Sequence, residues 1–244
     1  MEVERKIMTK VPTILELLEA GAHFGHQSSR WHPKMKPYIF GERNGVHIID
    51  LERTIEKLEE IQNFIKQVIS RGGVILFLGT KKQVHEVIER EAKRCGMPYI
   101  SNRWIGGYLT NFFSVIKLVK RYKDLVQKRD SGQLEKYTKK ERLNFEKEIA
   151  KLESEIFGVK DLEKIPDAIF IWDVRKEKTA IAEAKSKKVP VIGICDTNVN
   201  PEEIEYVIPV NDDATKTIDL VIKYMADCVI DAKAESEKNK TEKK

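Results

Sequence analysis

Residues 74–100, VILFLGTKKQVHEVIEREAKRCGMPYI, decide the fold class of this chain. The stretch begins with a continuous apolar run at 74–78, turns at Gly79-Thr80, continues with a helical pattern over about 81–94, and ends with a short extended run at 98–100. An apolar run without polar alternation is typical of a strand buried on both faces, as strands of parallel sheets are. The stretch therefore predicts a strand–helix–strand unit of a parallel sheet.

The same alternation returns in the second half of the chain. Apolar runs at 168–172, 189–195 and 206–209 predict further strands, and helical patterns lie at 178–187 and around 218–229. Strands separated by helices predict a three-layer α/β/α domain whose sheet is mostly parallel. We assign residues 12–108 and 158–232 to this discontinuous α/β domain.

Residues 109–157 interrupt that alternation. Their apolar residues step by three and four along two runs that Ser131-Gly132 separates. The predicted seam consists of Leu109, Phe112, Ile116, Val119 and Val126 on the first run and Phe145, Ile149, Leu152 and Ile156 on the second. This spacing predicts an inserted antiparallel helical hairpin with a narrow coiled-coil seam, anchored on the α/β body by Phe112 and Phe113.

The two ends of the chain predict smaller elements. Residues 14–18 carry a short helical stripe, residues 23–36 break all periodicity and predict a loop, and two extended runs flank the hairpin-turn signal Asn44-Gly45. Asp50 can cap a helix that begins at residue 51. The charged, apolar-free tail 233–244 is predicted to be disordered.

Composition excludes several classes of protein. The chain has 244 residues, of which 41% are apolar and 34% charged, and no window approaches the 18 consecutive apolar residues of a membrane span. The first ten residues lack the apolar core of a secretion signal. Cys95, Cys195 and Cys228 form no C-x-x-C motif. We therefore expect neither a disulfide framework nor a cysteine zinc site, and a reducing cytoplasm fits best.

The net charge of +5 is unevenly spread. Residues 161–232 carry −6, the tail 233–244 carries +2, and residues 1–160 carry +9. Within the predicted hairpin, residues 117–147 hold 11 basic and 5 acidic groups. A basic portion beside an acidic one fits a molecule that meets a polyanion on one side, whereas the plainer explanation is that lysine-rich helices are simply solvated.

Gly79-Thr80-Lys81-Lys82 follows a predicted strand and opens a predicted helix, which is a place where anions bind. The motif has neither the glycine-bounded loop of a Walker sequence nor the spacing G-x-G-x-x-G. It therefore favours the backbone phosphate of a nucleic acid over a soluble nucleotide.

Carboxylates and amides follow the last two predicted strands. Asp196, Asp212 and Asp213 are expected near the carboxyl ends of parallel strands, where ligands of such sheets bind. Three carboxylates there are suited to Mg²⁺, but Asp and Asn more often cap helices and close turns. The sequence leaves both uses open.

His23, His26 and His32 lie close together in the predicted loop. They invite a zinc hypothesis, but no cysteine is near and no fourth ligand is evident, so internal hydrogen bonding or stacking on RNA is favoured and no metal site is assigned. The sequence also contains no motif that would pair a Ser or Cys nucleophile with a histidine, because G-x-S-x-G is absent. No catalytic residue is predicted.

Basic and aromatic residues alternate at 30–38 and again at 103–108. Cations meet phosphates and flat rings stack on unpaired bases, although Trp31 and Trp104 are explained at least as well as core residues. From these clusters, the turn at 79–82 and the hairpin, we predict RNA contacts at Gln27, Arg30, Trp31, Lys34, Lys36, Arg43, Lys81, Lys82, Arg103, Lys120 and Arg121.

Five long blocks carry a resemblance to a known family. They are AGAHFGHQSSRWHPKMKPYIFGERNGVHIIDLERT (20–54), FLGTKKQ (77–83), RWIGGYLTNF (103–112), PDAIFIWDVRKE (166–177) and DTNVNPEEIEYVIPVNDDA (196–214). In this order, and over about residues 12–231, they resemble the bacterial form of the S-two family, the second protein of the small ribosomal subunit.

The resemblance implies an α/β/α sandwich with a projecting coiled-coil hairpin. It implies binding to small-subunit ribosomal RNA at the junction of body and head, and a part in docking the large, messenger-RNA-handling first protein of the subunit. It implies a structural role in translation in the cytoplasm, without catalysis, cofactor, membrane association or small-molecule substrate. The alternative is a Rossmann-like enzyme or binder of a phosphorylated metabolite that uses residues 79–82 and the aspartates; only RNA binding should weaken steeply with salt.

Overall fold

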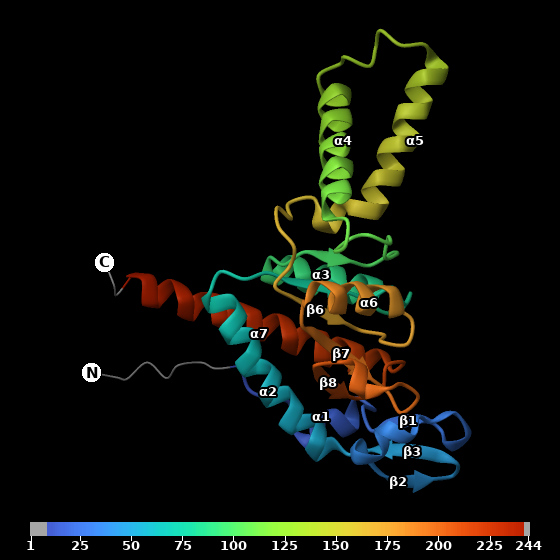
Figure 1. The fold of residues 1–244 in the computed structure, drawn as a ribbon, viewed down its shortest axis with the longest axis vertical. Coiled ribbons are helices and arrows are strands. Elements are labelled where there is room, and N and C mark those ends of the chain that lie inside the picture. Colours follow the sequence, from blue (N-terminus) through green and yellow to red (C-terminus); the bar gives the residue numbers. More distant parts are fainter. Residues whose placement is uncertain (1–8, 242–244) are drawn as a thin grey trace.

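Five strands form a parallel sheet at the centre of the molecule (Figure 1). In the computed structural model, which describes residues 9–241, the strand order is β5-β4-β6-β7-β8 and every neighbouring pair is parallel. The strands are β4 (Ile75–Leu78), β5 (Tyr99–Ile100), β6 (Ala168–Ile171), β7 (Val191–Cys195) and β8 (Tyr206–Pro209). The predicted α/β class with a mostly parallel sheet is confirmed.

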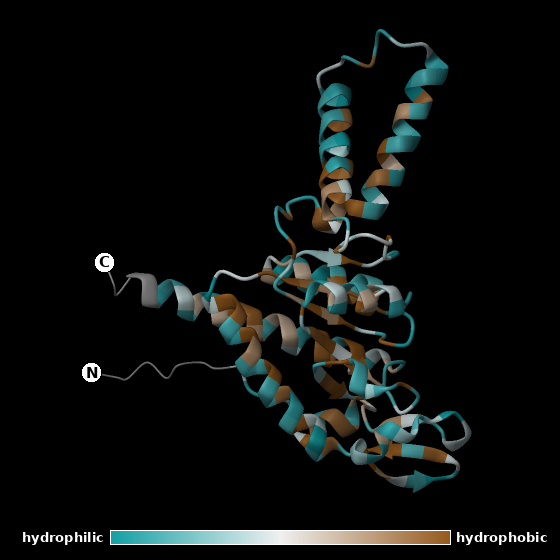
Figure 2. Ribbon diagram, viewed as in Figure 1, coloured by the Kyte–Doolittle hydropathy of each residue, from teal (hydrophilic) through white to brown (hydrophobic). Residues whose placement is uncertain are grey.

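Both faces of the sheet are buried, which explains why its strands read as unbroken apolar runs. Ile75 and Phe77 of β4 face one hydrophobic cluster, whereas Leu76 and Leu78 face the other. The helices α2 (Leu51–Ser70), α3 (His85–Cys95) and α7 (Thr215–Thr241) contribute to the first cluster, and α6 (Lys178–Lys187) contributes to the second. Figure 2 shows the hydrophobic residues gathered in the sheet and in the helix faces beside it.

The helix predicted from residue 81 begins four residues later. Residues 81–84 form a turn, and α3 begins at His85 without a side-chain hydrogen bond at its N-cap, Val84. At its other end, Gly96 adopts the left-handed conformation (φ 63°) that closes many helices. The turn matters below because it directs Lys81 toward the ends of the neighbouring strands.

A three-stranded antiparallel sheet of order β1-β3-β2 precedes the main sheet. The elements of this N-terminal unit are α1 (Ile14–Glu19), β1 (Phe24–Gln27), η1 (Ser28–Arg30), η2 (Pro33–Tyr38), β2 (Ile39–Arg43) and β3 (Val46–Ile49). Asn44 (φ 54°) and Gly45 (φ 74°) are both left-handed, so the predicted hairpin turn is confirmed. Asp50 caps α2 as predicted, because its side chain accepts from the backbone N–H of Glu52 at 3.0 Å.

Strand β1 lies in the stretch that the sequence predicts as a loop. It pairs with β3 through Phe24↔Ile48 and Gln27↔Val46, with an irregular register between the two pairs. Periodicity cannot reveal such a strand, because pairing with a neighbour defines it rather than an apolar alternation.

Two helices, α4 (Phe112–Asp130) and α5 (Lys139–Ile156), project from the body, and η3 (Phe157–Val159) follows them (Figure 1). Arg121 Nε lies 3.0 Å from Glu148 Oε1, which links the two helices across the hairpin. The buried side chains are Val115, Val119, Tyr122 and Leu125 on α4 and Ile149, Leu152 and Ile156 on α5. The coiled-coil character of the pair stays a prediction.

The buried stripe of α4 differs from the predicted seam. Val119 is buried as predicted, and Val126 is partly buried against the second cluster. Val115, Tyr122 and Leu125 are also buried although the predicted seam leaves them out, because two adjacent apolar stripes fit the same spacing. Phe112 packs against the second cluster as predicted, but Phe113 is 67% exposed and is not an anchor.

The predicted disorder of the tail is wrong for residues 233–241, which continue α7. Lys233 Nζ donates to the backbone carbonyls of Cys95 and Gly96 at 2.7 and 3.2 Å, and the Ala, Glu and Lys residues of this stretch favour helix. The last three predicted tail residues, 242–244, lie outside the described residues.

The buried carboxylate of Glu183 on α6 fixes the base of the hairpin. Its two oxygens accept hydrogen bonds of 2.8–3.1 Å from Trp104 Nε1, the backbone N–H groups of Gly107, Leu109 and Thr110, and Thr110 Oγ1. Burial alone would raise the pKa of Glu183, but these donors favour the ionised form and hold its pKa below the usual value. One charge thus orders the whole segment that leads into α4.

Glu183→Gln should lower the free energy of unfolding at pH 7 by about 2–4 kcal/mol, because the amide turns an NH₂ group toward several buried donors. A carboxyl with a lowered pKa stabilises the fold above its unfolded pKa, and this stability is lost as the pH falls through the folded pKa. The difference between wild type and variant in urea unfolding should therefore shrink below about pH 4. Glu86→Gln, at an exposed position of α3, is the control; an equal loss there, or a difference that does not change with pH, would contradict this role.

Candidate nucleic-acid interface

Three aspartates meet at the carboxyl edge of the parallel sheet. Asp173, Asp196 and Asp212 follow β6, β7 and β8, and all three are buried. Lys81 Nζ lies 2.9 Å from both Asp212 Oδ2 and Asp213 Oδ1, and 3.4 Å from Asp173 Oδ2. The predicted gathering of carboxylates is present, and a lysine lies among them.

The charges in this cluster depend on one another. Burial alone would lower the pKa of Lys81, but its hydrogen bonds to Asp212 and Asp213 and the charge of Asp173 raise that pKa above its usual value. Burial raises the pKa of Asp212 to about 6, and Asp196 adds to the rise while Lys81 opposes it. Lys81 thus serves as an internal counter-ion, which differs from the phosphate contact that the sequence predicts for it.

His26 joins the N-terminal unit to this edge. Its Nδ1 lies 3.0 Å from Asp196 Oδ1, and its backbone N–H donates to Thr197 Oγ1 at 2.8 Å. The backbone N–H of His32 donates to the carbonyl of Thr197 at 2.8 Å. Internal hydrogen bonding, one of the two roles predicted for these histidines, is therefore what the fold gives His26.

His26, Asp196 and Asp212 each offer one ligand atom, and the three atoms lie within 4.8 Å of one another. Asp212 Oδ1 is buried and has no hydrogen-bond partner in the described part of the chain. One imidazole and two carboxylates suit a divalent metal ion, so these residues could hold one, whereas His23, His26 and His32 do not make that set. Lys81 and a protonated His26 offset the same carboxylates by themselves.

The predicted cations of the N-terminal unit point to solvent. Gln27 and Arg43 pair with Val46 from opposite sides of β3, so the strand register brings them to one end of the small sheet. Arg30, Lys36 and Arg43 are exposed, and no carboxylate within residues 9–241 forms an ion pair with any of them. These three positive charges are uncompensated.

Two members of the same cluster are placed less freely than predicted. Lys34 Nζ lies 2.6 Å from Glu202 Oε1 in η4 (Pro201–Glu203), although both side chains are more than half exposed and such a pair adds little stability. Trp31 is half-buried, and its ring centroid lies 5.0 Å from that of His47. Lys34 is therefore held only weakly by Glu202, and Trp31 is partly used in packing.

The other predicted residues lie elsewhere on the molecule. Lys82, Arg103 and Lys120 are exposed, whereas Arg121 is engaged with Glu148. Trp104 is buried, as the core explanation predicts. Figure 1 places the β1-β3-β2 sheet and the α4–α5 hairpin at opposite ends of the long axis. The predicted residues of the small sheet and those of α4 therefore lie on two separate surfaces, and Lys81 and Lys82 lie on neither of them.

The sequence did not single out Glu183 as a functional residue, although it holds the hairpin surface in place. Its one signal is a carboxylate among Ala180, Ile181 and Ala184, on the face of α6 that is buried. Lys187 lies four residues further on, but it is exposed and forms no ion pair with Glu183 among the described residues, so the backbone and Trp104 supply the partners that a buried charge requires.

The fold and these surfaces define a structural protein, an α/β scaffold that presents basic groups at its two ends. Comparison of the sequence with known protein families matches residues 17–232 to the family described as Ribosomal protein S2. The chain belongs to this family and is a structural ribosomal protein of the small subunit. Within residues 9–241, no helix has both the length and the apolar composition that crossing a bilayer requires.

The fold should become less stable as the pH rises through the pKa of His26. The hydrogen bond to Asp196 raises that pKa, although burial opposes the rise. A histidine whose pKa is higher in the folded than in the unfolded protein stabilises the fold fully below its unfolded pKa of about 6.5. This stabilisation is lost as the pH rises through the folded pKa. His26→Gln should therefore cost about 1–2 kcal/mol at pH 6 and less at pH 8.5, as measured by thermal unfolding. A constant difference across this range would show that the imidazole charge plays no part.

Proposed function

We propose that this protein binds small-subunit ribosomal RNA through two basic surfaces. The N-terminal surface consists of Gln27, Arg30, Lys34, Lys36 and Arg43, and the hairpin surface lies on α4 and α5. The observation that carries the proposal is that Arg30, Lys36 and Arg43 are exposed and lack any ion-pair partner among the described residues. Uncompensated cations on a rigid scaffold are what a phosphate backbone requires.

The charge of the hairpin supports the second surface. Residues 117–147 hold 11 basic and 5 acidic groups, although Arg121 and Lys128 pair with Glu148 and Asp124. Lys120 is among those left exposed, on the side of α4 away from its buried stripe. Two surfaces at opposite ends suit a protein that touches two RNA segments in the cytoplasmic ribosome.

The metabolite-binding alternative lacks support at residues 79–82. A phosphate there would meet Lys81 only by displacing three carboxylates within 3.4 Å of its ammonium group. The helix begins at His85, so its free N–H groups do not start at the glycine turn. Neither cofactor nor catalytic residue is proposed.

A part in docking the large, messenger-RNA-handling first protein of the subunit is also proposed. Its support is an exposed apolar surface on the N-terminal unit: Ile14, Leu15 and Leu18 of α1 are 42%, 64% and 43% exposed, and Phe24 of β1 is 51% exposed. Apolar side chains gathered outside a core are typical of protein contact surfaces. The sequence stripe predicted at 14–18 thus faces mainly outward, with Leu17 alone buried.

Replacing Lys34 and Lys36 together by Ala should weaken incorporation into the small subunit and leave the fold intact, because both side chains are exposed. The plot of log affinity for ribosomal RNA against log salt should become less steep by about one unit per lost phosphate contact. Lys185→Ala/Lys187→Ala on α6 changes the charge equally and is the control. If the first variant assembles normally at elevated salt, the N-terminal surface is not a main RNA anchor.

Deleting residues 123–144 and closing the gap with a short Gly-rich turn should leave a folded α/β protein. The deletion spares Val115, Val119, Ile149 and Leu152, which lie at the base of the hairpin, together with the Glu183 network. The product should bind the small subunit more weakly, or fail to recruit neighbouring proteins, in a reconstitution assay.

Hydrogen exchange on the full-length free protein checks the same point independently. The hairpin tip should exchange faster than β4, because short helix pairs are marginal without a partner. Equal protection from exchange at the tip and in β4 would mean that the hairpin unfolds together with the core. That result would contradict the idea that the hairpin tip becomes ordered only when it binds RNA.

A further inference from the structure

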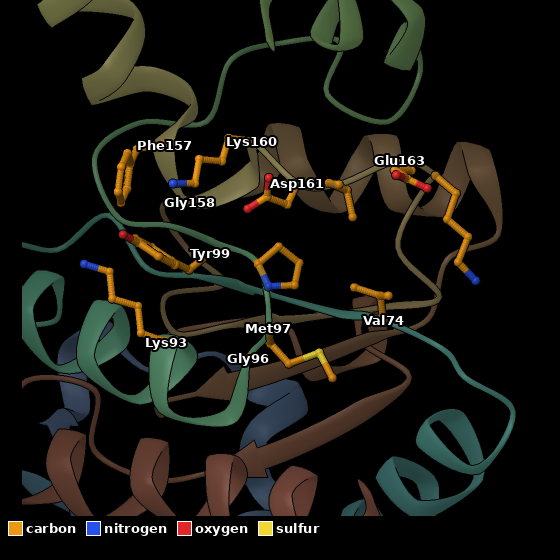
Figure 3. Close-up of a pocket in the computed structure, with 13 residues that line it drawn as sticks. Val74, Lys93, Gly96, Met97, Tyr99, Phe157, Gly158, Lys160, Asp161 and Glu163 are labelled. Atoms are coloured by element: carbon orange, nitrogen blue, oxygen red, sulfur yellow. The ribbon is translucent and has the colours of Figure 1, made fainter. Parts of the chain in front are cut away.

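A cavity of about 590 Å³ lies between the α/β body and the segment that returns from the hairpin (Figure 3). Met97 and Pro98, just before β5, form part of its lining, and residues 157–164 form the opposite wall. None of these residues belongs to the two basic surfaces described above. The size is within the range of pockets that enclose small ligands.

One end of the cavity combines aromatic rings with cations. Lys160 Nζ lies 4.3 Å and Lys93 Nζ 5.4 Å from the ring centroid of Phe157, and Lys93 Nζ lies 5.9 Å from that of Tyr99. Figure 3 shows the two lysine nitrogens gathered beside these rings, with Asp161 and Glu163 farther along the rim. Lys93 Nζ forms an ion pair with Glu89 Oε1 at 2.6 Å, whereas Lys160 has no carboxylate partner within the described chain.

Close packing of the backbone holds Phe157 in place at this end of the cavity. A Cβ on Gly158 would lie 2.1 Å from the backbone oxygen of Tyr99, so the chain after α5 lies directly against β5. The hydroxyl of Tyr99, in turn, donates to Glu89 Oε1 at 3.0 Å. Phe157 is thereby fixed at the edge of the sheet, and its ring is only half-buried.

We propose that this cavity, the Phe157 pocket, takes a nucleotide: its phosphate at Lys93 and Lys160, and its base over the rings and Pro98. Aromatic faces stack on any base, and nearby lysines neutralise the phosphate. Asp161 and Glu163 can accept hydrogen bonds from the amino groups of a base edge. The proposal rests on the proposed RNA binding, because an unpaired nucleotide of an RNA chain is one source of this ligand; a free nucleotide is the other.

The same charges disfavour an acidic peptide. It would meet the two lysines at one end, but Glu163 on the rim has no cation partner among the described residues and would repel it. The other rim charges are paired, Asp161 with Lys123 at 3.4 Å and Lys164 with Asp167 at 3.1 Å. A nucleotide has the matching polarity, since it is anionic at one end and carries hydrogen-bond donors at the other. The basic hairpin above the pocket adds a route for an RNA strand.

The test uses the full-length protein and a fluorescent single-stranded RNA octamer of mixed sequence that contains 4-thiouridine. Phe157→Leu should weaken octamer binding about tenfold with an unchanged salt slope, because it removes one stacking face. Lys160→Ala should lower the salt slope by about 0.7, the value for one phosphate of a single strand. The control, Lys185→Ala on α6, lines no part of the pocket and should behave as wild type. Photo-crosslinks should map to residues 157–164.

Competition by mononucleotides separates the two sources of ligand. Displacement of the octamer by millimolar AMP or UMP, lost in Phe157→Leu, assigns the pocket to free nucleotides; binding of the octamer alone assigns it to an RNA chain. The proposal is overturned if wild type binds intact small-subunit ribosomal RNA but the Phe157 and Lys160 variants bind the octamer as wild type does. It is equally overturned if hexaglutamate displaces the octamer more readily than mononucleotides do. If the wild-type protein itself does not bind intact small-subunit ribosomal RNA, the proposed function is refuted instead.

Discussion

The ammonium group of Lys81, set among Asp173, Asp212 and Asp213, offsets a charge problem that the fold itself creates. A parallel sheet brings the carboxyl ends of all its strands to one edge, and in this chain three of those ends carry buried aspartates. Unpaired, such charges would cost several kcal/mol each. Lys81 from the β4 end and His26 from the N-terminal unit offset part of this negative charge. His26 thereby ties the β1-β3-β2 sheet to the body and orients its outward-facing cations.

The opposite side of the molecule uses the reverse arrangement. There a single buried anion, Glu183, collects backbone and side-chain donors from the segment that leads into α4. The aspartate cluster with Lys81 and the Glu183 network have the same effect: each holds a projecting basic element on the apolar core. The same scaffold can therefore present charge at both ends of its long axis (Figure 1), while two hydrophobic clusters fill the space on either side of its sheet. This division suits a structural ribosomal protein of the small subunit, the role that the family match establishes.

Local signals predicted most of the fold. Strands buried on both faces, the left-handed Asn44-Gly45 turn and the Asp50 cap each depend on a few consecutive residues, and all are present. What failed depends on distant partners. The sequence predicts Lys81 as a cation free to bind phosphate, because the aspartates that hold it lie 92–132 residues away. The predicted seam includes Val119 and the buried residues of α5 but leaves out Val115, Tyr122 and Leu125 of α4, because periodicity does not choose between adjacent stripes. The tail is predicted as disordered because its anchor on Cys95 and Gly96 is not visible in the sequence. Of the candidate site, the cations at 30–43 are exposed, their RNA contacts stay predictions, and their separation from those of α4 depends on the fold rather than on local sequence.

The most direct test of this account is sedimentation of the full-length tagged chain in sucrose gradients of a cell lysate. The account predicts that the protein travels with small ribosomal subunits at moderate salt and is progressively released as salt rises, since phosphate contacts dominate the binding. A protein that stays at the top of the gradient at every salt concentration, while the lysate's other small-subunit proteins sediment normally, would contradict it.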